Sequence, residues 1–385
     1  MSQSVDRIGR IECFPVLPRW LFVRVETDQG AIGWGEATLE GHGEAVIGAF
    51  EAVRDRLIGH DPDRIEDAWQ LLHRLGFYRG GPVLLSAIAG VDQALWDIKA
   101  RKLGVPVHQL LGGRVRDRLP VYAWIGGDRP ADVAAAAAAR QAQGFAAVKM
   151  NGTEDLDWLD SSARVDALVE RLGQVRATGI DVGVDFHGRV HRPMARTILR
   201  AIEPLTPLFA EEIVLSDNVD VAAQLAGFTA VPLAWGERLY SRWDYRAFFE
   251  RGAVDIVQPD LSHAGGISEC RRIAAMAETY DVAFAPHCPI GPLALAACLH
   301  VGAATPNFAI QEVSMGIHYN APSQDLTTLV RNPEMFAIEG GTMAVPSLPG
   351  LGVEIDEAAV RDMAKTPHRW RNPAWRGPNG DLREW

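Results

Sequence analysis

Eight short apolar β-runs alternate with amphipathic helical stretches from about residue 120 onward, and this rhythm limits the possible folds more than any other feature of the chain. Nearly continuous apolar strands that alternate with helices indicate a parallel sheet covered by helices. Eight such units fit a closed α/β barrel better than an open sheet. The expected strands span residues 121–124, 146–150, 181–186, 208–212, 231–237, 254–260, 282–287 and 308–312. The expected helices lie within residues 131–143, 193–202, 219–226, 243–251, 267–280 and 293–303.

The first hundred residues have a different order, with strands first and helices afterwards. β-rich segments at 8–17, 20–26 and 31–37 predict a hairpin or three-stranded meander, and helical patterns follow at 44–59, 65–76 and 83–103. Such segregation predicts a small α+β domain. The segment after about residue 320 is rich in Pro, Gly and Trp, and we expect it to return to this domain because tryptophan surface is usually buried.

Charge and cysteine content indicate which partners and which cellular compartment suit the chain. The formal net charge of −11 disfavours nucleic acid and anionic membranes. The four cysteines form no C-x-x-C pair, which favours a reducing compartment. Because we find neither a signal peptide nor a run of about 18 apolar residues, we expect a cytoplasmic protein.

Ionisable residues stand at the carboxyl ends of six consecutive expected strands, at spacings of 23 to 27 residues. Barrel enzymes keep their active sites at this end of the strands, so we expect these side chains to face one point. The six residues are Asp185, Glu211, Glu237, Asp260, His287 and Glu312.

Three of these carboxylates, Asp185, Glu211 and Glu237, come from adjacent strands. Carboxylates crowded together repel one another, and a hard dication would relieve that repulsion. Oxygen ligands without cysteine favour one Mg²⁺, with Mn²⁺ possible.

Two histidines belong to the same ring. His187 follows Asp185 by two residues, and His287 ends the seventh strand beside Asp260, which could fix its tautomer. A metal-held carboxylate with a histidine on each side suits removal of the proton α to that carboxylate and loss of a β-hydroxyl.

These residues lie in segments that resemble the mandelate racemase branch of the enolase superfamily along nearly the whole chain. The resemblance is carried by RWLFVRVETDQGAIGWGE, GFYRGGPVLLSAIAGVDQALWDIK, GGDRPADV, VDFHGRV, PLAWGERLYSR, QPDLSHAGGISEC, APHCPIGPLALAACLH, QEVSMGIHYN and PGLGVEIDE. It implies a modified (β/α)₇β TIM barrel, an α/β fold, with an α+β capping domain formed by both chain ends. The implied division is 1–118 for the N-terminal capping domain, 119–325 for the barrel and 326–385 for the segment returning to the cap.

Within this family the chain is most similar to the acid-sugar dehydratases. The resemblance implies that His287, paired with Asp260, takes the C2 proton and that His187 acts as the acid that expels the 3-hydroxyl. Glu312, in protonated form, would hydrogen-bond to the substrate carboxylate or enolate. The resemblance also implies that the substrate is an aldonic acid, with D-galactonate as the leading candidate, and that the product is a 2-keto-3-deoxy acid. It further implies that the chain forms a homo-oligomer, specifically an octamer.

The second strand differs from that of the family's racemases, whose K-x-K pair supplies a second base. Here the segment is Lys149-Met150-Asn151, so inversion at C2 is disfavoured, and Lys149 and Asn151 become candidate substrate ligands. Further candidates for specificity are Arg19, Trp20, His42, Tyr78, Arg79 and His318.

Two positions depart from the family pattern. Ile213 stands where proline usually follows the pair of glutamates, and Trp235 replaces a smaller residue two positions before Glu237. Strand alternation predicts that the Trp235 side chain points into the barrel beneath the metal.

Several alternatives stay open. The substrate could be another aldonate, such as gluconate, arabinonate, gulonate or altronate, or the enzyme could be a racemase or epimerase. A metal hydrolase of the amidohydrolase type would need H-x-H on the first strand, which VYAW lacks. A non-catalytic descendant would show a degraded ring, yet all six ring residues and His187 are present.

Overall fold

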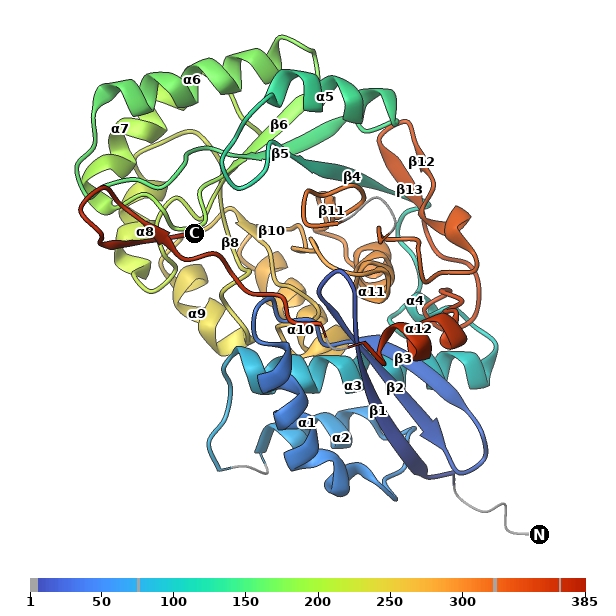
Figure 1. Cartoon of the computed structure of the whole chain (residues 1–385). Coiled ribbons are helices and arrows are strands. Elements are labelled where there is room, and N and C mark those ends of the chain that lie inside the picture. Colours follow the sequence, from blue (N-terminus) through green and yellow to red (C-terminus); the bar gives the residue numbers. More distant parts are fainter. Residues whose placement is uncertain (1–5, 75–76, 321–323, 367) are drawn as a thin grey trace.

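The computed structural model describes residues 6–74, 77–320, 324–366 and 368–385. The chain begins with an antiparallel meander of β1 (Ile8–Val16), β2 (Trp20–Thr27) and β3 (Ile32–Glu36), in that spatial order. The prediction of a three-stranded meander is therefore confirmed. Figure 1 shows these strands, drawn in blue, beside the first helices and apart from most of the barrel strands.

Three helices follow the meander: α1 (Gly43–Leu57), α2 (Ile65–Arg74) and α3 (Pro82–Leu103). Helix α3 lies so close to β3 that glycine is needed at the contact. A Cβ atom on Gly33 or Gly35 would lie 2.2 Å from a carbonyl oxygen of α3. The helix ends at Gly104, whose backbone is left-handed, as a terminating glycine commonly is.

Eight parallel strands form the barrel, and each overlaps one of the eight predicted β-runs. Each strand pairs with its sequence neighbour up to β10, β11 pairs with β4, and a bridge between Phe284 and Phe308 joins the last gap. The strands are β4 (Arg118–Ile125), β5 (Ala147–Asn151), β6 (Asp181–Asp185), β7 (Ala210–Glu211), β8 (Leu233–Trp235), β9 (Ile256–Val257), β10 (Ala283–Phe284) and β11 (Gln311–Val313).

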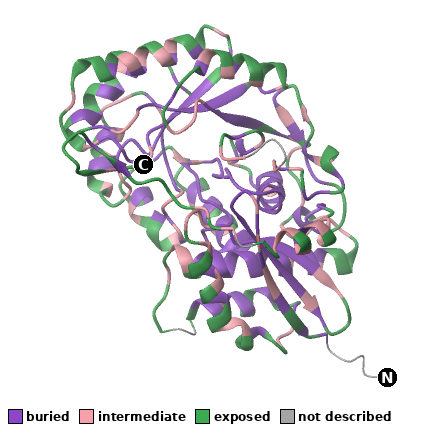
Figure 2. Ribbon diagram, in the orientation of Figure 1, coloured by how far each residue is buried: buried purple, intermediate pink, exposed green. Residues whose placement is uncertain are grey.

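A helix follows each of the first seven barrel strands, which gives the predicted (β/α)₇β arrangement. The helices are α5 (Val133–Ala142), α6 (Ser162–Arg176), α7 (Arg192–Ile202), α8 (Val219–Ala226), α9 (Arg242–Glu250), α10 (Gly266–Glu278) and α11 (Pro292–Ala304). Helix α6 was missed in the sequence, although Val165, Leu168, Leu172 and Val175 repeat at helical spacing and are buried. Figure 2 shows the exposed outer faces of α5 and α6, whereas α11 is buried. The short α4 (Val107–Leu110) links α3 to the barrel.

Trp235 lies on the outer side of the barrel, so the prediction that it points inward is wrong. Its indole N–H donates to the carbonyl of Val214 at 3.0 Å, and its ring lies 5.9 Å from that of Phe248 on α9. The neighbouring Ala234 belongs instead to the interior cluster, together with Tyr122, Ala147 and Phe209. The prediction assumed that side chains alternate between the two faces of the strand up to Glu237. Strand β8 ends at Trp235, before Glu237, and a shift of one residue exchanges the inward and outward faces of a strand.

The chain after β11 contacts both the barrel and the N-terminal domain. A hairpin of β12 (Ile338–Glu339) and β13 (Thr342–Ala344) follows the 3₁₀ turn Pro333–Phe336, and β13 pairs with the start of β4. Helix α12 (Glu357–Met363) then lies against β1, where Arg361 forms an ion pair with Glu12 at 2.9 Å. The chain ends in a hairpin of β14 (Trp375–Arg376) and β15 (Leu382–Arg383). The domain boundaries at residues 118 and 325 stay predictions.

In the part of the chain that the structure describes, no helix has both the length and the apolar character needed to cross a membrane.

Candidate active site

Lys149 lies at the centre of the acidic residues that follow the barrel strands. Its ammonium nitrogen is 2.9 Å from Glu211 Oε1, 3.2 Å from Asp185 Oδ2 and 3.0 Å from Glu312 Oε1. Burial disfavours the charged amine, but the surrounding carboxylates, Glu211 first, raise the pKa of Lys149 well above its ordinary value. The structure therefore brings three of the six predicted ring residues onto one buried cation.

The ionisation of Glu211 differs from that of Asp185, although both contact Lys149. Burial raises the pKa of Glu211 to about 8, and the nearby charge of Asp185 adds to the rise. Burial acts in the same direction on Asp185, but His187 and Lys149 outweigh it and hold the pKa of Asp185 below its ordinary value. Gln258, which follows β9, donates to Glu211 Oε2 at 2.7 Å, and Lys149 contacts the same oxygen at 3.0 Å.

A second group joins Asp185 to His187 and Glu237. His187 Nε2 lies 3.0 Å from Asp185 Oδ2, and the backbone N–H of His187 donates to Asp185 Oδ1 at 2.9 Å. His187 has a φ of 49°, an uncommon left-handed conformation for a residue with a side chain. One ligand atom from each of these three residues lies within 4.8 Å of the others, so the group could hold a metal ion.

His287 is held between two carboxylates. Its Nδ1 lies 2.9 Å from Asp260 Oδ2, and its Nε2 lies 3.1 Å from Glu237 Oε2. Burial disfavours the imidazolium, but Glu237 and Asp260 outweigh that effect and raise the pKa of His287 well above its ordinary value. The predicted pairing of His287 with Asp260 is therefore present as a contact.

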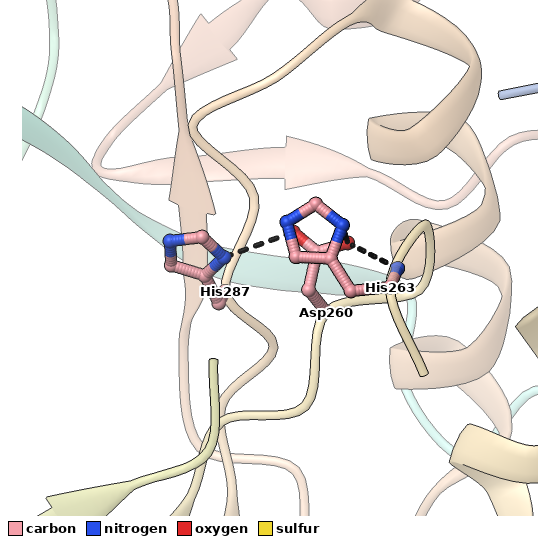
Figure 3. A group of neighbouring side chains, drawn as sticks. All are labelled: Asp260, His263 and His287. Atoms are coloured by element: carbon pink, nitrogen blue, oxygen red, sulfur yellow. Dashed lines mark hydrogen bonds and ion pairs between the residues drawn. The ribbon is translucent and has the colours of Figure 1, made fainter. Parts of the chain in front are cut away.

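His263 extends this chain of contacts into the N-terminal domain. Its Nδ1 is 3.7 Å from Asp260 Oδ1 and its Nε2 is 3.2 Å from Glu40 Oε2. Figure 3 shows His263 and Asp260 close to His287, and His287 follows β10 in the chain. Sequence reasoning missed His263 and Glu40, although the histidine stands only three residues after Asp260.

The two remaining features of the strand ends are Glu312 and the Glu212–Ile213 pair. Glu312 Oε2 accepts the backbone N–H of Cys288 at 2.8 Å. Glu212 has a φ of 40° and binds Arg238 at 2.5 Å, while Ile213 is fully buried in the hydrophobic core. An ion pair and apolar packing thus hold the segment where the family pattern has proline.

One cavity of about 340 Å³ lies between the barrel and the N-terminal domain, and only some of these groups line it, since Asp185, Glu211 and Asp260 do not. The predicted residues that line it are Arg19, His42, Lys149, His187, Glu237, His287 and Glu312. Leu39, Glu40, Trp124, Arg238, Tyr240, His263, Ile317, Tyr319, Asn372 and Trp385 also line it.

Five predicted substrate ligands do not line this cavity. Trp20 is buried and stacked on Phe22, and the Asn151 amide donates to the backbone carbonyl of Asp128 at 3.1 Å. His318 stacks on Trp124 and lies 3.2 Å from Asp128. The other two are the exposed side chains of Tyr78 and Arg79.

Comparison with known proteins agrees with this architecture. Residues 18–112 match the mandelate racemase / muconate lactonizing enzyme N-terminal domain, and residues 132–359 match the enolase C-terminal domain-like family. The chain belongs to the mandelate racemase / muconate lactonizing enzyme family. Membership in this enolase-superfamily group accounts for a barrel preceded by a separate antiparallel sheet.

Several relatives match along the full chain. Proteins described as D-galactonate dehydratases from Ralstonia pickettii and Variovorax paradoxus are 54% and 52% identical, over 98% of this chain and 100% of theirs. A crystal structure from Agrobacterium radiobacter, described as an enolase proposed to be a galactarate dehydratase, holds sodium and L-malate. It superposes with a TM-score of 0.89 at 32% identity, covering 98% of this chain and 100% of its own.

Proposed function

We propose that this chain dehydrates an aldonic acid, with D-galactonate as the leading substrate, to a 2-keto-3-deoxy acid. The observation that carries the proposal is a pair of histidines, His187 and His287, that line one cavity from opposite sides of the barrel. His187 follows β6 and His287 follows β10, and three strands separate these two in either direction around the barrel. The full-length similarity to proteins described as D-galactonate dehydratases supports the choice of substrate.

We further propose that the site holds one Mg²⁺, for which Mn²⁺ could substitute. Asp185 and Glu237 offer hard oxygen ligands, and Asp185 Oδ2 is buried without a hydrogen bond, although nitrogen atoms of Lys149 and His187 lie 3.2 and 3.0 Å away. Glu211 is the proposed third ligand. Its carboxylate and the Asp185 carboxylate both contact the ammonium group of Lys149. When bound, a divalent cation stabilises negative charge that develops on a substrate carboxylate.

The histidines divide the proton transfers between them. His287 Nε2 takes the proton from C2 while Asp260 holds Nδ1 in its protonated tautomer, and the C2 electron pair forms the enol. His187 Nε2 gives a proton to the 3-hydroxyl, so the C3–O bond breaks and water leaves. The enol then gains a proton at C3 to become the 2-keto-3-deoxy acid.

Lys149 and Glu312 are the residues that we propose for binding the reacting end of the substrate. Both line the cavity, and both are almost completely buried. The ammonium group offers positive charge to the substrate carboxylate, and Glu312 can donate a hydrogen bond in its protonated form. Pre-placed groups of this kind stabilise developing charge without having to reorganise.

The test is turnover of an aldonic acid library with Mg²⁺, read as keto-acid formation. We expect His287→Asn to abolish exchange of the C2 hydrogen in D₂O, and His187→Asn to abolish dehydration while retaining exchange. His191→Asn is the matched control, because His191 stacks on Trp158 and does not line the cavity. An absence of turnover on every acid sugar would refute the proposed reaction.

A racemase or epimerase on the same scaffold is the alternative that this experiment separates. In the family's racemases, the second base is the last lysine of the K-x-K segment, and Asn151 stands at that position here. The amide of Asn151 donates to the backbone of the loop at 127–128 and carries no basic nitrogen. Inverted, deuterated substrate without keto acid would favour this alternative over dehydration.

We also propose that the enzyme is cytoplasmic and a homo-octamer. The four cysteines are free, and three of them are buried, which suits a reducing compartment. Light scattering of the purified protein measures the number of subunits.

A further inference from the structure

The residues after α12 form a segment that passes from the N-terminal domain to the barrel over the cavity. We call residues 368–385 the C-terminal strap. Figure 1 shows the strap, in red, leaving the region of α12 and crossing toward α8. Asn372 and Trp385 of the strap line the cavity, so a segment remote from the barrel strands forms part of its wall.

Both ends of the strap are anchored. Near its start, His368 contacts the backbone carbonyl of Pro18, and Arg371 forms an ion pair with Glu44 on α1 at 3.2 Å. Near its end, Arg383 donates to the carbonyl of Leu156 at 2.8 Å and forms an ion pair with Asp157 at 2.6 Å. Because one anchor lies on each domain, the strap position over the cavity is fixed by contacts at both sides.

Trp370, beside the first anchor, and Trp385, beyond the second, form an aromatic roof with Tyr319, which follows β11. The ring of Trp385 lies 6.2 Å from Tyr319 and 5.8 Å from Trp370, and the rings of Tyr319 and Trp370 are 5.6 Å apart. The guanidinium carbon of Arg19 lies 4.1 Å from the centre of the Tyr319 ring and 5.0 Å from that of Trp370. Cation–π contacts of this kind hold a charged group against aromatic faces.

The strap also touches the loop of the N-terminal domain that lines the cavity. A Cβ atom on Gly41 would lie 2.4 Å from Asn372 Oδ1, so this glycine leaves room for the asparagine side chain. Leu39, Glu40 and His42 on either side of Gly41 line the cavity as well. The roof is therefore one packed unit made from the strap, this loop and Tyr319.

The floor and the roof of the cavity differ in chemistry. The floor holds the buried groups assigned to the reacting end, Lys149, Glu312 and His287. The roof offers aromatic faces, an amide and a guanidinium group, which suit the carbon face and the hydroxyls of a polyol.

We propose that the C-terminal strap determines specificity for the distal, polyhydroxy end of an acid-sugar substrate. Trp385 packs on the carbon chain beyond C4, and Asn372 hydrogen-bonds to a hydroxyl in the same region. This inference rests on the proposed dehydratase function and concerns chain length rather than the reaction at C2 and C3.

The test compares Trp385→Ala with Trp385→Phe and wild type on two substrates. One is the six-carbon aldonate turned over best, and the other is the five-carbon aldonate with the same configuration from C2 to C4. We expect Trp385→Ala to raise KM for the six-carbon acid about tenfold, because an aromatic packing contact is removed, and to change kcat less. The preference for six over five carbons falls by a similar factor, and Trp385→Phe restores most of it.

Trp243→Ala is the matched control, since Trp243 is 52% exposed on α9 and does not line the cavity. Equal loss of activity on both acids, or an unchanged preference for chain length in Trp385→Ala, would overturn the role of the strap. An Asn372→Ala variant keeps the inference testable if the tryptophan variants fail to fold, and we expect it to lower the same preference. No turnover by wild type refutes the dehydratase proposal instead, so the two failures are distinguishable.

Discussion

Replacing Asp260 by asparagine tests the base that we assign, because the change reverses one hydrogen bond and alters little else. Asp260 Oδ1 accepts the backbone N–H groups of Ser262 at 2.6 Å and His263 at 3.2 Å, while Oδ2 faces His287 Nδ1 at 2.9 Å. An asparagine must keep its oxygen on those two donors, so its NH₂ group would face His287. Nδ1 of His287 must then accept, and the proton moves to Nε2, the atom that has to take the C2 proton.

The expected loss is large because the base is placed in the wrong tautomer rather than moved. The corresponding change in a Ser-His-Asp triad lowers kcat about 10⁴-fold. We expect a loss of about 10³- to 10⁴-fold in C2 hydrogen exchange and in dehydration, which corresponds to about 4 to 5.5 kcal/mol. KM should change little, because Asp260 does not line the cavity.

The assay is C2 deuterium incorporation by NMR together with keto-acid formation under saturating substrate. Asp255→Asn is the matched control. Asp255 lies directly before β9, whereas Asp260 lies after it, and the Asp255 carboxylate accepts the backbone N–H of Leu233 at 2.8 Å. Asp260→Asn retaining exchange within tenfold of wild type would contradict the assignment of His287 as a base oriented by Asp260.

Three further predictions concern the metal, the barrel wall and pH. Glu211→Gln should weaken Mg²⁺ binding at least about tenfold by calorimetry if Glu211 is a ligand, and unchanged affinity would remove it from the set. Trp235→Leu should lower the free energy of unfolding by about 2 to 4 kcal/mol in urea and leave kcat nearly unchanged, since the indole fills space against α9; a large loss of kcat would return Trp235 to the site. Burial raises the pKa of Asp92 to about 7, so the folded state holds a proton that the unfolded state releases above about pH 4, and stability falls as pH rises through this window. Between pH 5 and pH 8, wild type should therefore lose about 2 to 3 kcal/mol relative to Asp92→Asn in urea unfolding, and parallel curves would contradict that pKa.

The barrel could be predicted because its strands are nearly continuous apolar runs separated by helices. Six of the seven helices that follow barrel strands, including Val219–Ala226, correspond to segments expected from the sequence. The ring of ionisable residues follows from the same rhythm, since each strand brings its last polar residue to the same end. Local pattern and barrel geometry therefore point to the same positions for Asp185, Glu211 and Glu312.

The contacts made between distant segments could not be predicted in the same way. Glu40 reaches His263 from a loop of the N-terminal domain, and Trp385 reaches the cavity from the far end of the chain. No periodicity in the sequence encodes either contact, because each contact depends on how the two domains pack together. The expected ligands Tyr78 and Arg79 are exposed and do not line the cavity.

Lys149 shows how the sequence and the packing combine in this site. The sequence places a lysine at a strand end, where a solvated side chain is an ordinary outcome. In the structure the Lys149 side chain is instead buried to 1% exposure among Asp185, Glu211 and Glu312. An unpaired buried ammonium group would cost several kcal/mol, so the lysine needs these carboxylates. The lysine and the acidic ring therefore stabilise each other, and a dication entering the ring has to share Asp185 and Glu211 with this ammonium group. In the proposed site, such sharing would leave a positive charge beside the metal and near the substrate carboxylate, and this local charge would let a chain with a net charge of −11 attract an acid.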